Sequence, residues 1–388
     1  MSYKLLTPIM AGALTIVASA AVAQNAPHAA TGTIPEGQAK GLMKKPMPAE
    51  RRLPRLPRET FDFRPSPGPV NPPQIAPGNV GGKPASSVNV ATEPVEASEN
   101  SQDSIGTQNY GTGNVNTVYH YSDHRIEPSI VPKYPYRTSG YFLNTFNGTD
   151  FFFCTATLIS KSILVTAGHC IYDTGANKYA TAATFYPACV NCNGGGALVE
   201  PYGRATARYF LATKGWRDAT PSTALDQGFD VGLVVLNKRA GTTTEIGTYT
   251  GSLPFCHTDC LQPFWQLSQL GYPSNYDGGN RMNYGEHIEK SNTRDYQHGS
   301  GMQGGSSGGP HISNIGNLLD SATNKGEFTA RNRVFAVTSW GYTDESVKIQ
   351  GSSSLSGPSN SNNFKSMYNN MCNKAIAMHG AGSCTLLQ

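Results

Sequence analysis

Residues 151–170 read Phe-Phe-Phe-Cys-Thr-Ala-Thr-Leu-Ile-Ser-Lys-Ser-Ile-Leu-Val-Thr-Ala-Gly-His-Cys, and this stretch decides the fold class. It contains two short apolar runs, at 151–153 and 163–166, and similar runs follow at 231–236 and 334–338. Clusters of Gly, Asn and Asp separate them, and helical periodicity is scarce. Short strands between turn residues predict an all-β sandwich or barrel.

The exception lies at the C-terminus. Five apolar residues there recur at i, i+3, i+4, i+7 and i+11, namely Phe364, Met367, Tyr368, Met371 and Ala375. This spacing places them on one face of a helix. We therefore expect an amphipathic helix that closes the chain and packs on the β-structure.

The N-terminus resembles a secretory signal over residues 1–23. Lys4 precedes a short apolar core, and Ala21-Val22-Ala23 is a small-x-small cleavage site. The core is too short for a membrane anchor and is interrupted by Pro8 and Gly12. We expect a secreted protein, extracellular or periplasmic, in an oxidising compartment.

Residues 24–115 are expected to be a disordered, Pro-rich pro-segment or linker, followed by one domain at 116–388. Fourteen of the 26 prolines lie in residues 25–115, and the only aromatics between 25 and 108 are Phe61 and Phe63. Such a stretch buries too little apolar area to offset the entropy lost on folding. The basic run at 51–55 is either a processing site or part of a solvated linker that is never cut.

Composition excludes two classes of protein. Charged residues make up 14% of the chain, against about 25% in a typical one, and the net charge is only +4. That charge is too small for a phosphate-binding surface, so we expect no nucleic-acid partner. After the N-terminus no stretch of about 20 apolar residues occurs, so we expect no membrane span.

Three segments carry side chains suited to nucleophilic catalysis, in the chain order His, Asp, Ser. They centre on His169 in Ala167-Gly168-His169-Cys170, on Asp230 before an apolar run, and on Ser307 within Gly304-Gly305-Ser306-Ser307-Gly308-Gly309-Pro310. A serine hydroxyl needs an adjacent base, and the imidazole needs a carboxylate to fix its tautomer. The glycines allow the sharp turn that backbone donors to an oxyanion require.

These segments resemble the signatures of the chymotrypsin/trypsin-like serine proteases, and Ser339-Trp340-Gly341 supplies a fourth match in the family's order. The resemblance runs from Tyr119 to the C-terminal helix. It implies two antiparallel β-barrels with the catalytic residues between them. It also implies a serine endopeptidase that acts on protein or peptide substrates without a cofactor or a metal, and we expect a monomer.

The resemblance also implies individual roles. His169 is the general base and then acid, Asp230 orients it, and Ser307 is the nucleophile. The backbone N–H groups of Gly305 and Ser307 form the oxyanion hole, and Cys154 pairs with Cys170 around the histidine. The substrate backbone pairs as an added strand with residues 338–341, which are Thr338, Ser339, Trp340 and Gly341.

Some assignments have competitors. Asp226 lies four residues before Asp230 and is the alternative carboxylate, although the apolar run after Asp230 favours that residue. Ser306 is the alternative nucleophile. The three histidines His257, His298 and His311 are expected to lie in loops or on the surface rather than to bind a ligand.

The chain departs from the family at the position before the nucleophile. Trypsin-type enzymes carry Asp there, paired with a newly freed N-terminal amine, whereas this chain has Ser306. No Ile-Val-Gly-Gly start occurs either, and Ile130-Val131-Pro132-Lys133 is the nearest stretch. The chain is more similar to the bacterial glutamyl-endopeptidase-like branch. That branch has a His where this chain has Thr338, and residues 299–303 at the expected pocket base contain no acid. The sequence therefore supports neither a Glu nor an Arg/Lys preference.

All eight cysteines lie after residue 153. Cys189 and Cys192, with Cys256 and Cys260, have spacings that a zinc site would also show. In an exported chain we favour disulfides, and proximity pairs Cys189 with Cys192, Cys256 with Cys260, and Cys372 with Cys384. The functional alternative to a protease is a secreted binding module that has lost catalysis on the same scaffold.

Overall fold

The computed structural model describes residues 119–220, 225, 228–258, 264–292, 295–316, 331–342, 347–356 and 363–388. It also describes three short strands of the leading stretch. The expected signal at 1–23 and most of the expected pro-segment lie outside the described residues, so both stay predictions.

The first half of the domain is a closed antiparallel barrel. Its strands pair in the ring β5-β10-β11-β12-β7-β6, and β6 also pairs with β5 to close it. These strands are β5 (Ser139–Thr145), β6 (Phe151–Leu158), β7 (Ile163–Thr166), β10 (Ala182–Pro187), β11 (Ala205–Ala212) and β12 (Gly232–Leu236). Phe142, Leu158 and Leu164 are fully buried in one of its apolar clusters, which explains the apolar runs in the sequence.

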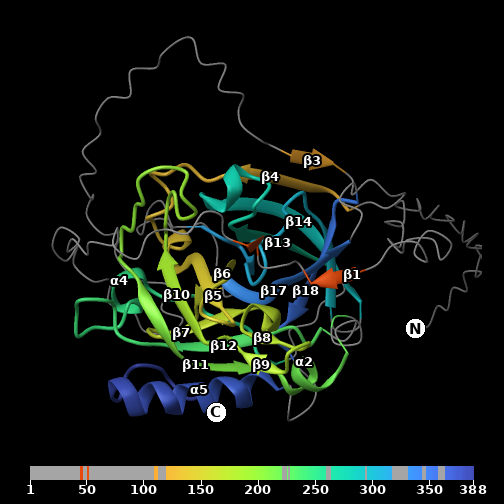
Figure 1. The fold of residues 1–388 in the computed structure, drawn as a ribbon. Helices are drawn as coiled ribbons and strands as arrows, with labels where there is room; N and C mark the ends of the chain where they lie inside the picture. Colours follow the sequence, from red (N-terminus) through yellow and green to blue (C-terminus); the bar gives the residue numbers. More distant parts are fainter. Residues whose placement is uncertain are drawn as a thin grey trace, which may run out of the picture.

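The second half is another closed antiparallel barrel, paired in the ring β13-β16-β17-β18-β15-β14. Its strands are β13 (Phe264–Gly271), β14 (Asn283–Asn292), β15 (Asp295–Gly299), β16 (Pro310–Ser313), β17 (Arg333–Tyr342) and β18 (Ile349–Ser354). The strand β4 (Tyr121–Arg125) adds to the outer edge of β14. The all-β, two-barrel prediction is confirmed, and Figure 1 shows the two barrels one above the other.

Between the strands lie short elements. They are η2 (Tyr136–Thr138), η3 (Gly168–Cys170), β8 (Tyr172–Asp173), β9 (Lys178–Tyr179), α2 (Lys214–Asp218), α4 (Gly247–Thr250) and η4 (Asp277–Gly279). Among them η3 matters most, because it carries the histidine of the first motif.

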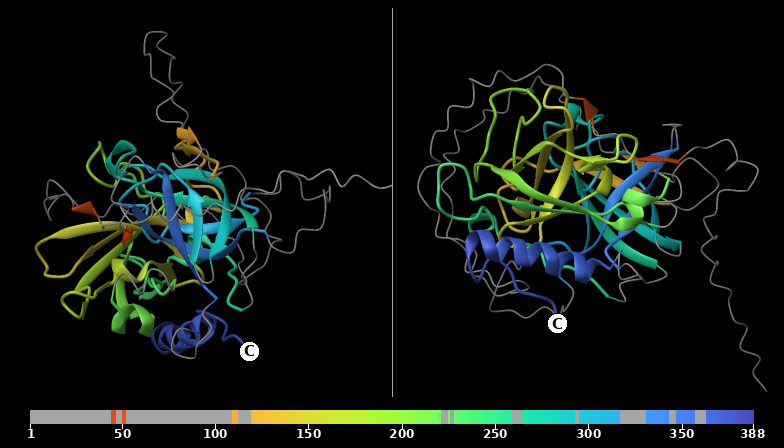
Figure 2. Two further views of the ribbon diagram at one scale, coloured as in Figure 1. Left: turned by 90° about the vertical axis from the view of Figure 1, so that its right-hand side faces the viewer. Right: turned by 60° about the horizontal axis from the view of Figure 1, so that its bottom comes forward.

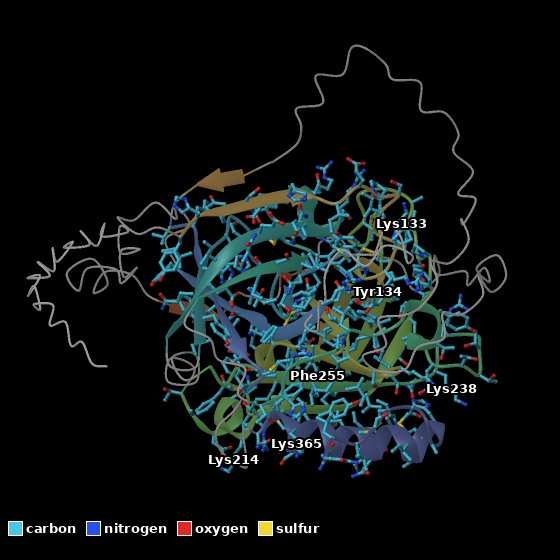
Figure 3. The ribbon with its side chains drawn as sticks, turned by 180° about the vertical axis from the view of Figure 1, so that it is seen from behind. Lys133, Tyr134, Lys214, Lys238, Phe255 and Lys365 are labelled. Carbon is cyan, nitrogen blue, oxygen red and sulfur yellow. A yellow bond between two sulfur atoms is a disulfide. The ribbon has the colours of Figure 1, made fainter. Side chains whose placement is uncertain are left out.

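The C-terminal helix α5 (Phe364–His379) forms as predicted, and the five residues of its predicted apolar face are buried. The Asn363 side chain caps its first turn by accepting from the Ser366 N–H. The helix lies along β11 and β12 of the first barrel, although it follows the second in sequence (Figure 2). Figure 3 shows Phe255 above the helix, where its ring packs against those of Phe364 and Tyr368. None of the described helices has the length and apolarity to cross a bilayer.

Three short strands of the leading stretch pair with the domain (Figure 1). β1 (Lys44–Pro46) lies antiparallel to β17, β2 (Glu50–Arg51) to β6, and β3 (Asn109–Gly111) to β4. Composition alone predicts no strand here. Each strand is two or three residues long, and its partner lies in the domain.

The disulfides follow the predicted pattern. Cys154 is bonded to Cys170, Cys189 to Cys192, and Cys372 to Cys384, so these three predictions are confirmed. Their thiols are unavailable as zinc ligands, which removes the zinc interpretation at Cys189 and Cys192. Cys256 is also disulfide-bonded. Its predicted partner, Cys260, lies outside the described residues, and that pairing stays a prediction.

Candidate active site

The first two motif residues meet at one end of the first barrel. His169 lies in η3 directly after β7, and Asp230 precedes β12, which pairs with β7. The Asp230 carboxylate is fully buried and faces the ring of His169, with 2.7 Å between Oδ2 and Nδ1. Its Oδ1 accepts the backbone N–H of His169 at 2.8 Å. The structure thus brings His169 and Asp230 together, while Asp226 lies outside the described residues.

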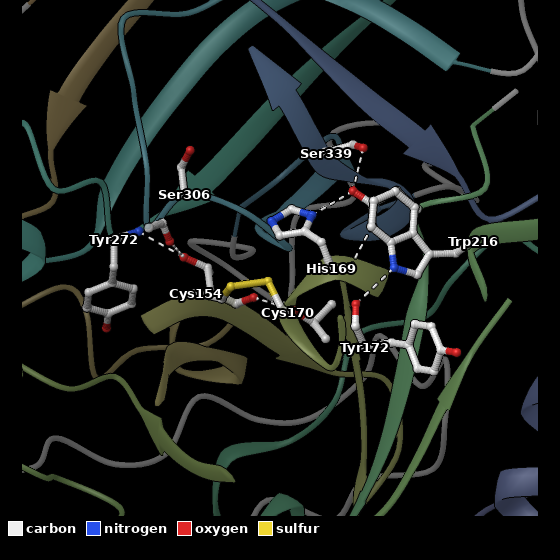
Figure 4. Close-up of a disulfide and its surroundings, with 12 residues drawn as sticks. Cys154, His169, Cys170, Tyr172, Trp216, Tyr272, Ser306 and Ser339 are labelled. Carbon is white, nitrogen blue, oxygen red and sulfur yellow. Dashed lines mark hydrogen bonds and ion pairs between the residues drawn. A yellow bond between two sulfur atoms is a disulfide. The ribbon is translucent and has the colours of Figure 1, made fainter. Parts of the chain in front are cut away.

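Two further side chains hold this pair (Figure 4). Ser339 donates its hydroxyl to Oδ2 of Asp230 at 2.7 Å, so the carboxylate accepts three hydrogen bonds. The ring centroid of the buried Trp216 lies 6.1 Å from that of the His169 imidazole. The Trp216 ring is itself held by a hydrogen bond from its Nε1 to the Tyr172 carbonyl. A carboxylate held in this way fixes the orientation of the ring that it contacts.

Ser307 lies in the loop between β15 and β16, on the second barrel. Its carbonyl accepts the backbone N–H of Thr155 at 2.8 Å, and the Thr155 hydroxyl donates to the Gly305 carbonyl at 2.9 Å. Thr155 belongs to β6, next to Cys154, which is bonded to Cys170 beside His169. One residue of the first barrel therefore holds the serine loop of the second against the histidine region.

The Ser306 side chain is used in a hydrogen bond within the loop. Its hydroxyl donates to the Gln303 carbonyl at 2.7 Å, and its backbone N–H bonds to the same carbonyl. This geometry favours Ser307 over Ser306 as the nucleophile. On the other side, Nε2 of His169 is buried and has no hydrogen-bond partner among the described residues.

Hydrogen bonds to two carbonyls fix the orientation of two peptide groups in the serine loop. The Gly304 carbonyl accepts from the Ser274 N–H at 2.7 Å, and the Ser306 carbonyl accepts from the Gly309 N–H at 2.9 Å. Because a trans peptide is planar, each N–H points away from its own carbonyl. The N–H groups of Gly305 and Ser307 are thus directed away from Ser274 and Gly309.

Two glycines make this turn possible. Gly305 has a φ of +90° and Gly308 a φ of +77°, a region that side chains disfavour. A Cβ at Gly305 would collide with the Phe153 ring, and one at Gly308 with the Thr166 hydroxyl. The glycine requirement that the sequence suggested therefore holds at these two positions.

Residues 338–341 lie on β17, but their side chains do different things. Ser339 supports Asp230, whereas the buried Thr338 hydroxyl accepts from Gln269 and contacts His311 inside the second barrel. Trp340 is fully buried. The edge of β17 at Trp340 and Gly341 pairs with β1, so the predicted substrate strand has a backbone partner from the chain itself.

The predicted pocket loop at residues 299–303 is supported by an acid that sequence reasoning missed. Asp123, on β4, accepts the Gly301 N–H at 2.6 Å and is 1% exposed. Burial raises the pKa of this carboxyl to about 7, although hydrogen bonds from Gly301 and Tyr276 act in the opposite direction. Asp123 is 178 residues away in sequence, and no motif surrounds it.

Protonation of Asp123 should make stability depend on pH. The folded state holds this proton up to about pH 7, whereas an unfolded carboxyl releases it near 3.8. The stabilising contribution is full below about pH 4 and is lost as the pH rises through 7. The difference corresponds to about 4 kcal/mol, at 1.36 kcal/mol per pKa unit.

The Asp123→Asn variant removes this titration while keeping the size of the side chain. We expect its Tm to rise relative to that of the wild type as the pH increases from 5 to 8, in thermal unfolding followed by circular dichroism. Asp218→Asn, at an exposed acid, should show no such trend. A constant difference between wild type and Asp123→Asn across this range would contradict the prediction.

The expectation that His298 and His311 lie in loops or on the surface is wrong. Both are on strands of the second barrel, β15 and β16, and both are fully buried. They face inward because of strand alternation, which a short polar stretch does not reveal in sequence. His257 is half-buried in a loop, as expected.

A family model described as Trypsin matches residues 131–353. A glutamyl endopeptidase of Bacillus licheniformis is 26% identical over 189 residues, covering 49% of this chain and 52% of that protein. An extracellular metalloprotease of Bacillus subtilis is 29% identical over 129 residues, covering 33% of this chain and 37% of that protein. The chain thus spans about half or less of the length of these relatives.

Among solved structures, protease Anisep from Arthrobacter nicotinovorans is similar to this chain with a TM-score of 0.46 and 22% identity. The match covers 60% of this chain and 94% of that protein.

Proposed function

The chain belongs to the trypsin family, and on that premise we propose that it is a serine endopeptidase. The observation that carries the proposal is the contact between Nδ1 of His169 and the buried Asp230 carboxylate, beside a serine loop fixed by Thr155. The contact leaves Nε2 of His169 for the serine hydroxyl, because Nδ1 is used by the carboxylate.

The proposed reaction passes through an acyl-enzyme. Ser307 Oγ attacks the scissile carbonyl carbon while its proton moves to Nε2 of His169, and Asp230 stabilises the imidazolium. When the tetrahedral intermediate collapses, the C–N bond breaks and His169 protonates the departing amine. Water, activated by His169, then hydrolyses the ester and restores Ser307.

The oxyanion is stabilised by the backbone N–H groups of Gly305 and Ser307. The support for this role is the bonding of the preceding carbonyls to Ser274 and Gly309, which directs both N–H groups the other way. Donors oriented before the reaction need no reorganisation as charge develops.

The substrates are proteins or peptides. A Glu preference is not proposed, because the Thr338 side chain is buried and bonded to Gln269 and His311 rather than offered to a substrate. No cofactor takes part in the proposed reaction. The low net charge argues against nucleic acid as a partner, and we propose a monomer.

We also propose that the protein is exported as a precursor, with residues 1–23 as signal and 24–115 as pro-segment. The disulfides support an oxidising compartment. A domain boundary near residue 116 is supported by β4, which begins at Tyr121 and pairs with β14 of the second barrel.

The experiment is digestion of a peptide library by the purified protein, with the cuts read by mass spectrometry, alongside labelling by a fluorophosphonate. A protease cuts the library, and the label maps to the peptide that contains Ser307. A protein that binds library peptides without cutting them, and that takes no label before or after removal of the leading stretch, is instead the non-catalytic binding module.

A further inference from the structure

A buried cluster of three histidines and one glutamate lies inside the second barrel. His287 and Glu289 stand two residues apart on β14 and so share a face, while His298 comes from β15 and His311 from β16. Each is at most 4% exposed. One side-chain donor atom from each residue lies within 4.8 Å of those of the other three.

The hydrogen bonding of this cluster is unbalanced. All three imidazoles converge on the single atom Oε1 of Glu289, with Nε2 of His287 at 3.0 Å, Nδ1 of His298 at 3.6 Å, and Nδ1 of His311 in closest contact. Oε2 of Glu289 has no hydrogen-bond partner among the described residues, and at most one ring nitrogen of His298 has one, the Gln350 side chain. Buried polar atoms without partners are rare and indicate a missing water or ion.

Nearby side chains resolve only part of this imbalance. Gln350 stands opposite His298 across β15 and β18 and forms a side-chain hydrogen bond with it, while its amide nitrogen donates to the Met302 carbonyl and its oxygen accepts from Gln269. The Ser352 hydroxyl donates to Oε1 of Glu289 at 3.5 Å, which adds to the crowding at that atom. The other ring nitrogen of His298 faces Glu289 and the other two rings, whose centroids lie 4.2 Å and 4.6 Å from its own.

The Thr338 hydroxyl bonds to His311. Its oxygen lies 2.9 Å from Nε2 of His311 and 3.3 Å from the Gly309 carbonyl, and when its single proton goes to Gly309 it accepts from Nε2 of His311. Nδ1 of His311 then either carries a second proton toward Glu289 or offers a lone pair. A hydrogen bond to the far nitrogen is the usual support of a metal-binding imidazole.

We propose that His287, Glu289, His298 and His311 bind a divalent transition-metal ion of the Zn²⁺ type. Imidazoles and a carboxylate are the ligands that such an ion takes, usually four of them around a structural site. The ion would accept a lone pair from each ring and relieve the crowding at Oε1. Because all four ligands come from the protein and are buried, the site is structural. It joins β14, β15 and β16, next to Thr338 on β17.

The test uses the full chain dialysed against Zn²⁺ or Co²⁺ and then freed of excess metal. We expect about one bound ion per chain by mass spectrometry of the metal, a visible absorption band of four-coordinate Co²⁺, and a Tm that falls by several degrees with a chelator. His298→Gln should lose the ion, whereas His257→Gln, in a half-buried loop outside the cluster, should retain it.

A wild-type chain that holds no ion after dialysis, with the same Tm in Zn²⁺ and in chelator, overturns the proposal. The cluster would then be an imidazolium–carboxylate pair of His311 and Glu289 with two neutral rings. Because the wild type decides this point, the test does not depend on the folding of His298→Gln.

A second inference rests on different residues and on the proposed function. The leading stretch pairs with both edges that flank the candidate active site. β1 places Lys45 opposite Gly341 and Pro46 opposite Trp340, on the predicted substrate strand. After only three intervening residues, β2 places Glu50 opposite Phe153, the residue before Cys154.

The two edges belong to different barrels. On β17, Trp340 is adjacent to Ser339, which donates a hydrogen bond to Asp230. On β6, Phe153 is adjacent to Cys154, which forms the disulfide with Cys170. β1 runs antiparallel to β17, as a strand added by β-augmentation does. In keeping with this cover, Ser307 is fully buried and Nε2 of His169 is shielded from solvent.

We infer that the segment 44–51 inhibits the precursor. β1 occupies the backbone edge at 340–341 that is predicted to pair with the substrate, and β2 occupies the β6 edge that leads to Thr155 and the serine loop. The occupant is thus part of the same chain, and its effective concentration at the site is high. Activation requires that this segment leave the two edges, by cleavage or by exchange with a substrate.

The test compares fluorophosphonate labelling rates of the intact full chain. Lys45→Pro removes a backbone donor from β1, and we expect labelling at least about tenfold faster than in the wild type. Lys83→Pro, in the leading stretch but outside both strands, should leave the rate unchanged. In addition, a synthetic peptide of residues 42–53 should inhibit the Lys45→Pro protein competitively, and the same peptide with Pro at position 45 should inhibit it less.

Equal labelling of wild type and Lys45→Pro, with no inhibition by the peptide, overturns the inference while leaving the protease assignment intact. Absence of labelling in every form, including protein whose leading stretch has been removed by limited proteolysis, counts against the proposed function itself. The two failures are therefore distinguishable.

Discussion

Replacing Ser307 with alanine is expected to lower kcat/KM for a cleaved peptide by about 10⁶-fold and to abolish fluorophosphonate labelling. Without Oγ no acyl-enzyme forms, and His169 has no nucleophile to deprotonate. The residual rate reflects binding and the oxyanion donors alone. Progress curves with a peptide found in the library digest, measured against a buffer blank, give the ratio.

The matched control is Ser306→Ala, one residue away in the same loop. The Ser306 hydroxyl is bonded to the Gln303 carbonyl, so its loss should cost about 1 kcal/mol of stability and less than tenfold in activity. If Ser306→Ala abolishes labelling while Ser307→Ala retains it, the nucleophile has been assigned to the wrong serine.

Asp230→Asn is expected to lower kcat by about 10⁴-fold with little change in fold. An amide in this place presents an N–H to the imidazole, which stabilises the wrong tautomer and cannot balance the imidazolium. Ser339 and the His169 backbone N–H keep the side chain in position, so KM should change much less than kcat. Steady-state kinetics separates the two constants, and circular dichroism checks the fold.

Asp226→Asn is the control for Asp230→Asn, because Asp226 is the other acid before the same apolar run. It should retain activity within a few-fold of the wild type. Loss of activity in Asp226→Asn together with full activity in Asp230→Asn would move the orienting role to Asp226.

The fold was predictable because strand and turn signals alternate regularly from Tyr119 onward and because the terminal helix shows a 3.6-residue period. The residues that pair β1 and β2 with the domain were not predictable. Their strands are two or three residues long in a proline-rich context, and what fixes them is an open edge on β17 and on β6. Pairing with the open edge of another strand does not require a periodic pattern in the segment that pairs with it.

The candidate site was predictable in part. His169, Asp230 and Ser307 stand in local motifs, and the pairing of Cys154 with Cys170 followed from the family resemblance. The supports of the site come from distant segments instead: Asp123 lies 178 residues from the Gly301 that it holds. The buried imidazoles on β15 and β16 were also missed, because inward and outward positions cannot be assigned in strands rich in polar residues.

The bonds from Thr155 to the serine loop have a consequence for what activity measures. The proposed base and its carboxylate belong to one barrel, the proposed nucleophile belongs to the other, and the Thr155 backbone and hydroxyl bond to the loop that carries it. Both barrels can be folded correctly while the protein is inactive, if the contact between Thr155 and the serine loop is lost. Turnover therefore reports how the two barrels are docked, and it should disappear under mild denaturation while the strands of each barrel remain intact.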